Sequence, residues 1–194
     1  MKKIVSAFLV SVIFISALFF LPSCTSEHPI EKFGNDLKSA DSYQINIIIS
    51  DAPVFGSMSI IQKVDGNIQY TYDTTIKSET YLEEIGNDTY HYTKDENGKW
   101  KKALWDKLST ESETSFIESI CSMLDPDNFE EVEGEKNKYA QKSDVNFAYC
   151  KDVVITIENN SYTIEMVSCA NDSTSERFVF SEFGNIELTL PNIE

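Results

Sequence analysis

Short runs in which apolar and polar residues alternate dominate this chain from residue 43 onwards. A period of two puts successive side chains on opposite faces of an extended backbone, so each run predicts a half-buried β-strand. Turn-forming residues such as Glu96-Asn97-Gly98 and Asn159-Asn160 separate the runs and predict antiparallel hairpins. The predicted strands are 43–49, 57–64, 68–73, 79–85, 89–94, 99–105, 153–158, 161–167, 178–183 and 186–190, of which the first six form a meander.

Two segments have helical spacing instead. Ile30, Phe33 and Leu37 would share one face of a helix over 30–40, and a second helix over 114–124 ends before Pro126. The acidic segment 127–138 is irregular and predicts a short helix and a loop. About ten antiparallel strands make a twisted sheet too long to stay flat, so we expect it to curl with the helices on its concave side.

The register of the second hairpin decides which side chains share a face. A three-residue turn at 65–67 places Ile60 opposite Tyr72 and collects most apolar groups on one face, so it is preferred to a two-residue turn. That face would either be filled core or line a ligand pocket. Buried tyrosine hydroxyls need polar partners, so a face rich in tyrosine is compatible with a pocket that holds water or the polar end of a ligand. The pocket candidates are Ile47, Ile60, Tyr70, Tyr72, Tyr90, Tyr92 and Trp100.

The N-terminus has the form of an export signal. Lys2 and Lys3 precede an apolar run that reaches Leu21. The sequence Leu21-Pro22-Ser23-Cys24 resembles the lipobox of bacterial lipoprotein precursors, although Pro22 replaces the usual small residue. This resemblance implies acylation of Cys24 and an extracytoplasmic protein anchored to a membrane by lipid; an ordinary secretory signal is the alternative. The expected organisation is a signal peptide at 1–23, a tether at 24–29 and one domain at 30–194.

Charge excludes one large class of partner. The chain has 16 Lys and Arg against 32 Asp and Glu, a formal charge of −16, which becomes −18 when the signal peptide with its two lysines is removed. Nucleic-acid binding needs clustered cations, and Arg177 is the single arginine. Lysines do gather between Lys94 and Lys107 around Trp100 and Trp105, which indicates either an anion-binding patch or a solvated strand face with balanced charge.

Catalytic motifs are absent from the sequence, so we expect no enzyme activity, no metal and no cofactor. His91 is the single histidine of the predicted domain, and it lies on the strand face opposite Tyr90 and Tyr92, where an exposed structural role is expected. The acidic group of Asp125, Asp127 and Glu130 or Glu131 lacks the glycine and the ligand ladder of a calcium loop. No carboxylate pair stands out for glycoside hydrolysis.

Cysteines provide a test of the strand register. With Asn159-Asn160 as a two-residue turn, Cys150 falls directly opposite Cys169, and export favours a disulfide between them. Cys121 lies on the apolar face of the second helix and is expected to be a buried free thiol.

The order of elements resembles a known family. A short helix, a long meander, a central helix and a second meander ending at 178–191 are similar to the LolA/LppX-like bacterial lipoproteins, as is Tyr90-His91-Tyr92 followed by Gly98-Lys99-Trp100. The resemblance implies an α+β, mostly β, incomplete barrel: a curved antiparallel half-barrel sheet with helices on its concave side and an apolar cavity that binds acyl chains in several members.

Three classes of function follow from these observations. The leading hypothesis is a lipid-anchored envelope lipoprotein that binds an apolar or lipid-like ligand without chemistry. The second is a surface interaction module that docks a partner protein of the envelope through its acidic face. The third, with the least support, is an enzyme acting on envelope glycans. A continuous apolar cavity would separate the first from the second.

Overall fold

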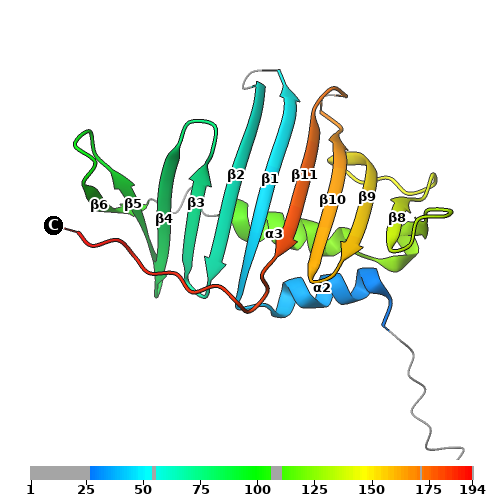
Figure 1. The fold of residues 1–194 in the computed structure, drawn as a ribbon, viewed down its shortest axis with the longest axis horizontal. Helices are drawn as coiled ribbons and strands as arrows, with labels where there is room; N and C mark the ends of the chain where they lie inside the picture. Colours follow the sequence, from blue (N-terminus) through cyan, green and yellow to red (C-terminus); the bar gives the residue numbers. More distant parts are fainter. Residues whose placement is uncertain (1–26, 54–55, 106–110, 171, 194) are drawn as a thin grey trace, which may run out of the picture.

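A computed structural model describes residues 27–53, 56–105, 111–170 and 172–193, with backbone alone for 111–115. It has one antiparallel sheet in the strand order β6-β5-β4-β3-β2-β1-β11-β10-β9-β8-β7 (Figure 1). The fold is therefore α+β and mostly β, consistent with the expected half-barrel, and the sheet stays open. The strands are β1 Ser42–Ala52, β2 Gly56–Asp65, β3 Ile68–Asp73, β4 Ser78–Ile85, β5 Asp88–Lys94, β6 Trp100–Trp105, β7 Phe129–Glu131, β8 Lys138–Gln141, β9 Cys150–Glu158, β10 Ser161–Ser168 and β11 Ser175–Ser181.

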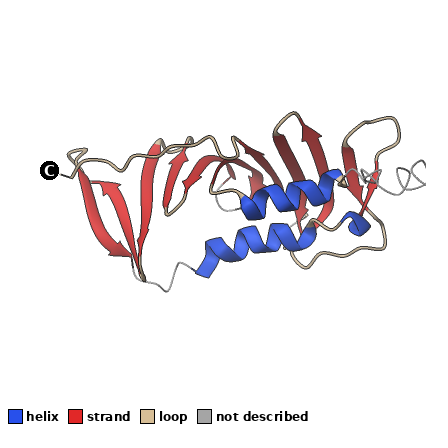
Figure 2. Ribbon diagram, turned by 90° about the horizontal axis from the view of Figure 1, so that it is seen from below, coloured by secondary structure: helices blue, strands red, loops and turns tan. Residues whose placement is uncertain are grey.

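Two helices lie on the same face of this sheet, which we call the helix-side face; the other is the outer face (Figure 2). They are α2 Pro29–Ser39 and α3 Glu111–Met123, and a 3-10 turn at Pro126–Asn128 follows α3. The ring nitrogen of His28 caps α2 by accepting a hydrogen bond from the backbone N–H of Ile30 at 3.3 Å. Both predicted helices are confirmed within a few residues.

The helices cover half of the sheet, and the hydrophobic core lies beneath them. Ile30 and Phe33 of α2 are fully buried, as are Ile155 on β9, Ile164 on β10 and Phe180 on β11. The Phe33 ring stacks on Tyr162 at 4.2 Å and meets Phe180 edge-on at 5.3 Å. Apart from Ile186, the buried apolar residues lie between positions 30 and 180. The predicted domain thus has a hydrophobic core of its own, as an independently folding domain needs.

We call β1 and β7–β11 the helix-covered half, and β2–β6 the helix-free half. Figure 2 shows the strands of the latter extending beyond the two helices. The six-stranded meander β1–β6 is confirmed, as is the three-residue turn between β5 and β6, where Gly98 has a φ of +76°.

The predicted register between β2 and β3 is wrong. The turn is Gly66-Asn67, which pairs Asp65 with Ile68 and puts Tyr72 opposite Ile61 rather than Ile60. Gly66 has a φ of +55°, the conformation that a two-residue hairpin turn gives readily to glycine. Because side chains alternate between faces, this shift of one residue moves the β3 tyrosines to the opposite face from Ile60.

Two further corrections concern the C-terminal half. The acidic segment contains a short strand, β7, besides the 3-10 turn and loop, and a second short strand, β8, begins at its last residue. The expected strand 186–190 is not part of the sheet: after Gly184 the chain leaves β11 and crosses the outer face near the ends of the meander strands (Figures 1 and 2). Ser42 Oγ and the Asp65 carboxylate accept hydrogen bonds from the backbone N–H groups of Ile186 and Leu188, at 3.2 and 2.8 Å.

The expected cysteine pairing is also wrong. The turn at Asn159-Asn160 is correct, but Asp152 has a φ of +54° at a β-bulge that adds one residue to β9. Beyond the bulge Cys150 lies opposite Ser168, and Cys121, Cys150 and Cys169 are all free thiols. Burial raises the pKa of the Cys150 thiol to about 11.

Candidate functional site: a groove beside helix α3

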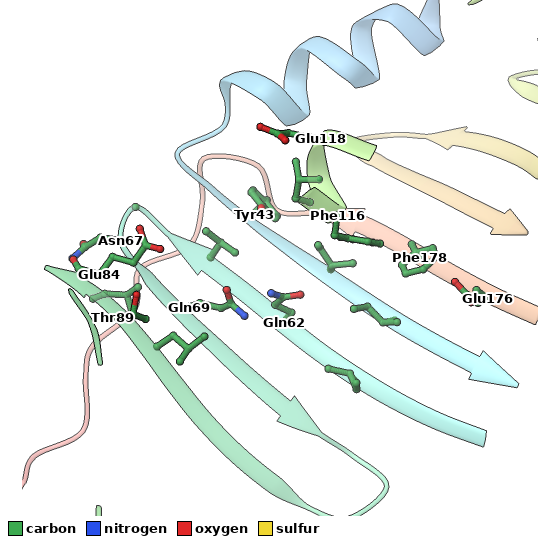
Figure 3. Close-up of a pocket in the computed structure, with 18 of the residues that line it drawn as sticks. Tyr43, Gln62, Asn67, Gln69, Glu84, Thr89, Phe116, Glu118, Glu176 and Phe178 are labelled. Atoms are coloured by element: carbon green, nitrogen blue, oxygen red, sulfur yellow. The ribbon is translucent and has the colours of Figure 1, made fainter. Parts of the chain in front are cut away.

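A groove of about 660 Å³ lies at the boundary between the two halves of the sheet, on the helix-side face (Figure 3). The middle of α3, at residues 116–118, forms one wall and strands β1–β4 form most of the floor. The apolar lining consists of Tyr43, Ile45, Ile47, Ile49, Ile60, Val64, Ile68, Leu82, Phe116, Ile117 and Phe178.

Strand pairing explains why the floor is apolar. Ile47 of β1 and Ile60 of β2 are direct cross-strand partners, so their side chains lie side by side on one face. Phe116 of α3 packs against Phe178 of β11, with ring centroids 5.3 Å apart. The two described helices lie mainly over β1 and β7–β11, so the apolar floor on β2 and β3 is only partly covered (Figure 2).

Of the seven pocket candidates from the sequence, the structure brings together Ile47 and Ile60. The other five, Tyr70, Tyr72, Tyr90, Tyr92 and Trp100, lie on the outer face, because the register of β3 to β6 places them opposite one another there. These five therefore do not line the groove. The shift of one residue at Gly66-Asn67 is the physical reason for this correction.

The outer-face aromatic residues form a cluster with paired charges. Tyr70 and Tyr81 rings lie 4.9 Å apart, and Tyr81 meets Trp100 edge-on at 5.4 Å. The Tyr70 hydroxyl donates a hydrogen bond to the Glu79 carboxylate at 3.2 Å, and burial together with this carboxylate raises the pKa of Tyr70 to about 12.

The lysines of this region are largely neutralised. Lys94 is paired with Glu79, and Lys101 with Asp95 at 3.1 Å. Lys102 lies 2.9 Å from Glu83 and 4.1 Å from the ring centre of Tyr90. At these three lysines the structure favours the second interpretation, a strand face with balanced charge. Lys107 lies outside the described residues.

Seven polar side chains also line the groove, and three of them are carboxylates. Figure 3 shows Glu84 beside Asn67 at one end of the groove and Glu176 beside Phe178 at the other, with Glu118 on α3. Sequence reasoning missed Glu176 because the strand was expected to start at 178. The signal was present: Glu176, Phe178 and Phe180 alternate, and Glu176 is the charged member of an otherwise apolar series. The remaining polar side chains are Gln62, Gln69 and Thr89.

The residues considered for catalysis and metal binding have structural surroundings. His91 lies opposite the tyrosine face, as predicted, and is half-buried rather than exposed, with its ring 4.5 Å from Trp105. Burial lowers its pKa, which favours neutral imidazole. The Asp125 carboxylate accepts a hydrogen bond of 2.9 Å from the backbone N–H of Asp127 and so caps the 3-10 turn. Across the described ranges, no three His, Cys, Asp or Glu side chains are arranged to hold a metal ion.

Comparison with known proteins adds no family. No family model matches the chain, and no curated protein matches it significantly in sequence. Within the described part of the chain, none of the helices has the length and apolar character needed to cross a membrane. The lipidation candidate Cys24 lies outside the described residues.

Proposed function

We propose that this protein is a cell-envelope lipoprotein, anchored through lipid at Cys24, whose domain binds an apolar or lipid-like ligand in the groove beside α3 without catalysing a reaction. The observation that carries the proposal is the apolar floor around Ile47 and Ile60, which two helices leave partly uncovered. Apolar area left open in this way is a favourable binding surface, since each methylene transferred from water contributes up to about 0.8 kcal/mol.

The size and lining of the groove support a small amphiphilic ligand. A volume of about 660 Å³ is within the roughly 300–1,000 Å³ of typical small-molecule sites, which combine apolar walls with a few polar groups that orient the ligand. Gln62, Asn67, Gln69 and Thr89 are the uncharged polar residues of this lining.

The N-terminal segment supports a location at the membrane. The Cys24 motif resembles a lipobox, and α2 begins at Pro29, so the tether between them extends no further than about 20 Å. A domain held that close to the bilayer can exchange ligands with it. The resemblance to LolA/LppX-like lipoproteins agrees with this role.

A pair of matched variants tests the groove. Ile47 and Ile48 are neighbours on β1, with Ile47 in the groove and Ile48 on the outer face. We expect Ile47→Trp to weaken binding of an uncharged environment-sensitive dye such as Nile red to the domain starting at residue 25 by at least about tenfold, because the indole fills part of the groove. Ile48→Trp should change the affinity by less than about twofold.

A series of linear alcohols of increasing length provides a second measurement. Displacement of the dye should tighten by up to about fourfold for each added methylene until the groove is filled. Absence of dye binding to the intact domain, or equal effects of the two tryptophan variants, would reject the groove as the binding site. The docking module would then be the better hypothesis.

Anchoring is tested separately in a bacterial host. The full-length chain should fractionate with membranes and incorporate a labelled fatty acid, and Cys24→Ala should abolish the label and release or mislocalise the protein. If the alanine variant keeps the label, acylation at Cys24 is ruled out.

A further inference from the structure

The charge of the groove narrows the kind of ligand that fits it. Three carboxylates line it, at Glu84, Glu118 and Glu176, while the described lining residues include no Lys, Arg or His. A fatty-acid carboxylate or a lipid phosphate would therefore meet like charge here, within a domain that is already strongly acidic.

Glu176 has the most unusual surroundings of the three. Its cross-strand partners are Ile49 on β1 and Met166 on β10, so its carboxylate lies between apolar neighbours on the helix-side face. The side chain is half-buried, and this burial raises its pKa. A carboxylate partly removed from water is costly unless a counter-charge accompanies it.

Three other acidic residues on the same sheet have such a counter-charge. Glu165 on β10 lies 3.6 Å from Arg177, Glu83 lies 2.9 Å from Lys102, and Glu79 is paired with Lys94. Among the ion pairs formed by the described residues, none involves Glu84, Glu118 or Glu176. The three carboxylates of the groove therefore have no counter-charge among the described residues and remain available to a cationic ligand.

We infer that the ligand of this groove is a single-chain amphiphile with a positively charged amine or ammonium head, its chain on the floor around Ile47 and Ile60 and its head beside Glu176. This inference rests on the proposed function and names the chemical class of its ligand. The cation supplies the counter-charge that Glu176 lacks, and the apolar chain supplies the contact with the floor.

The test compares ligands that differ in the head group alone. Decylamine, decanol and decanoate displace the uncharged dye from the domain starting at residue 25, at neutral pH and physiological salt, where surface charge is largely screened. We expect the amine to bind at least about tenfold more tightly than the alcohol, and the carboxylate to bind most weakly. Butylamine, which has the charge without the long chain, should compete at least about a hundredfold less well than decylamine.

Glu176→Gln and its matched control Glu165→Gln locate the head group. Glu165 is on the neighbouring strand β10 and faces the outer side, where it meets Arg177. In Glu176→Gln the amine should lose most of its advantage while the alcohol keeps its affinity, which also shows that the variant is folded. Glu165→Gln should preserve the advantage.

The outcomes separate the two proposals. If all three ten-carbon ligands bind alike, if decanoate equals the amine, or if Glu176→Gln leaves the advantage intact, the cationic ligand is rejected while the apolar groove stands. If butylamine competes as well as decylamine, the attraction is general charge and the inference also fails. If neither dye nor alcohol binds, the proposed function itself is wrong.

Discussion

The helix-covered and helix-free halves of this sheet bury their apolar side chains in different ways. In the helix-covered half the apolar residues of β9, β10 and β11 face the helices, and Val153, Ile155, Ile164 and Phe180 are fully buried. In the helix-free half the described residues that reach burial are Thr89 and Tyr92, one on each face. Aromatic residues there gather on the outer face instead.

The difference follows from what covers each face. Helices α2 and α3 cover about half of the strands, and beyond them Gln62, Gln69 and Thr89 interrupt the apolar helix-side face. On the outer face the segment after Gly184 provides some cover, and Ile186 within it is only 8% exposed. The groove lies where the apolar floor continues past the last helix. A sheet with too few helices thus creates a candidate binding surface at the boundary of its core.

The largest expected effect tests the contrast in burial directly. Phe180→Ala should lower the free energy of unfolding by about 3–5 kcal/mol, because it leaves a cavity against Phe33 in the helix-covered half. Ile60→Ala, on the same face in the helix-free half, should cost less than about 1.5 kcal/mol because water already reaches the groove. Urea unfolding followed by circular dichroism measures both, and equal losses would contradict the description of two unlike halves.

The second prediction concerns the cover on the outer face. Ile186→Ala should destabilise the domain by about 2 kcal/mol, since it removes a buried side chain from the segment that crosses the meander. Ile193→Ala, at a position 49% exposed, should stay within about 0.5 kcal/mol of the parent. If both changes are neutral in thermal and urea unfolding, the segment does not stabilise the helix-free half.

The attachment of α2 to the sheet should have a smaller, pH-dependent effect. The Tyr162 hydroxyl donates to the Asp36 carboxylate, and Lys32 lies 3.1 Å from that hydroxyl and also donates to Asp36. Burial alone would raise the pKa of Asp36, but these hydrogen bonds outweigh it and lower the pKa. Tyr162→Phe should therefore cost about 1 kcal/mol at neutral pH.

The sign of the pH dependence follows from the lowered pKa. A carboxylate whose pKa is depressed by folding stabilises the protein above its unfolded pKa of about 4 and loses that contribution as the pH falls through its folded value. The difference between the parent and Tyr162→Phe should accordingly shrink between about pH 4 and pH 2 in urea titrations. A difference that stays constant, or grows in acid, would mean that Asp36 is not the partner that matters.

The smallest expected effect is a gain in stability. Gly34 is in α2, and a Cβ added there would lie 3.6 Å from Cβ of Leu124, an ordinary contact. Gly34→Ala should stabilise the helix-covered half by about 0.5–1 kcal/mol by restricting the unfolded chain. Gly184→Ala is the matched control: its φ of +69° disfavours any side chain, so the same substitution should destabilise. Differential scanning calorimetry would detect both the gain and the loss of stability. A loss of stability in Gly34→Ala would show that the packing around Gly34 has no room for a methyl group.

Most of the elements were predictable because their signals are local. The six strands of the first meander and the hairpin between β9 and β10 follow from alternation and from turn residues, and α2 follows from the spacing of Ile30, Phe33 and Leu37. Strands β7 and β8 were missed because strands of three and four residues carry too short a pattern.

The segment 186–190 shows where such a signal misleads. Ile186, Leu188 and Leu190 alternate with polar residues like a strand, and their side chains are less exposed than those between them. Alternation indicates an extended segment with one face in contact. It does not say whether the backbone pairs with a sheet edge or crosses a sheet face, as this segment does.

About the candidate site, the sequence supplied Ile47 and Ile60 and missed Glu176 and Glu84. Both faces of β2 and β3 carry apolar groups, so the hydrophobic pattern was compatible with more than one register at the turn between them. Choosing the turn that collects the most apolar groups on one face gave the wrong register, because both faces are partly covered: one by the helices and the other by the segment after Gly184.

The sequence by itself determined the class of the fold, the extents of most strands and the apolar faces of the two helices, because periodicity and turn chemistry act over a few residues. Tertiary structure alone decided the turn that sends the tyrosines to the outer face, the bulge at Asp152 that puts Ser168 opposite Cys150, and the boundary at which Glu176 meets the apolar floor. The physical reason is that side chains in a strand repeat every two residues, so a shift of one residue exchanges the faces. Which face the apolar side chains occupy then depends on which other segments of the chain cover that face.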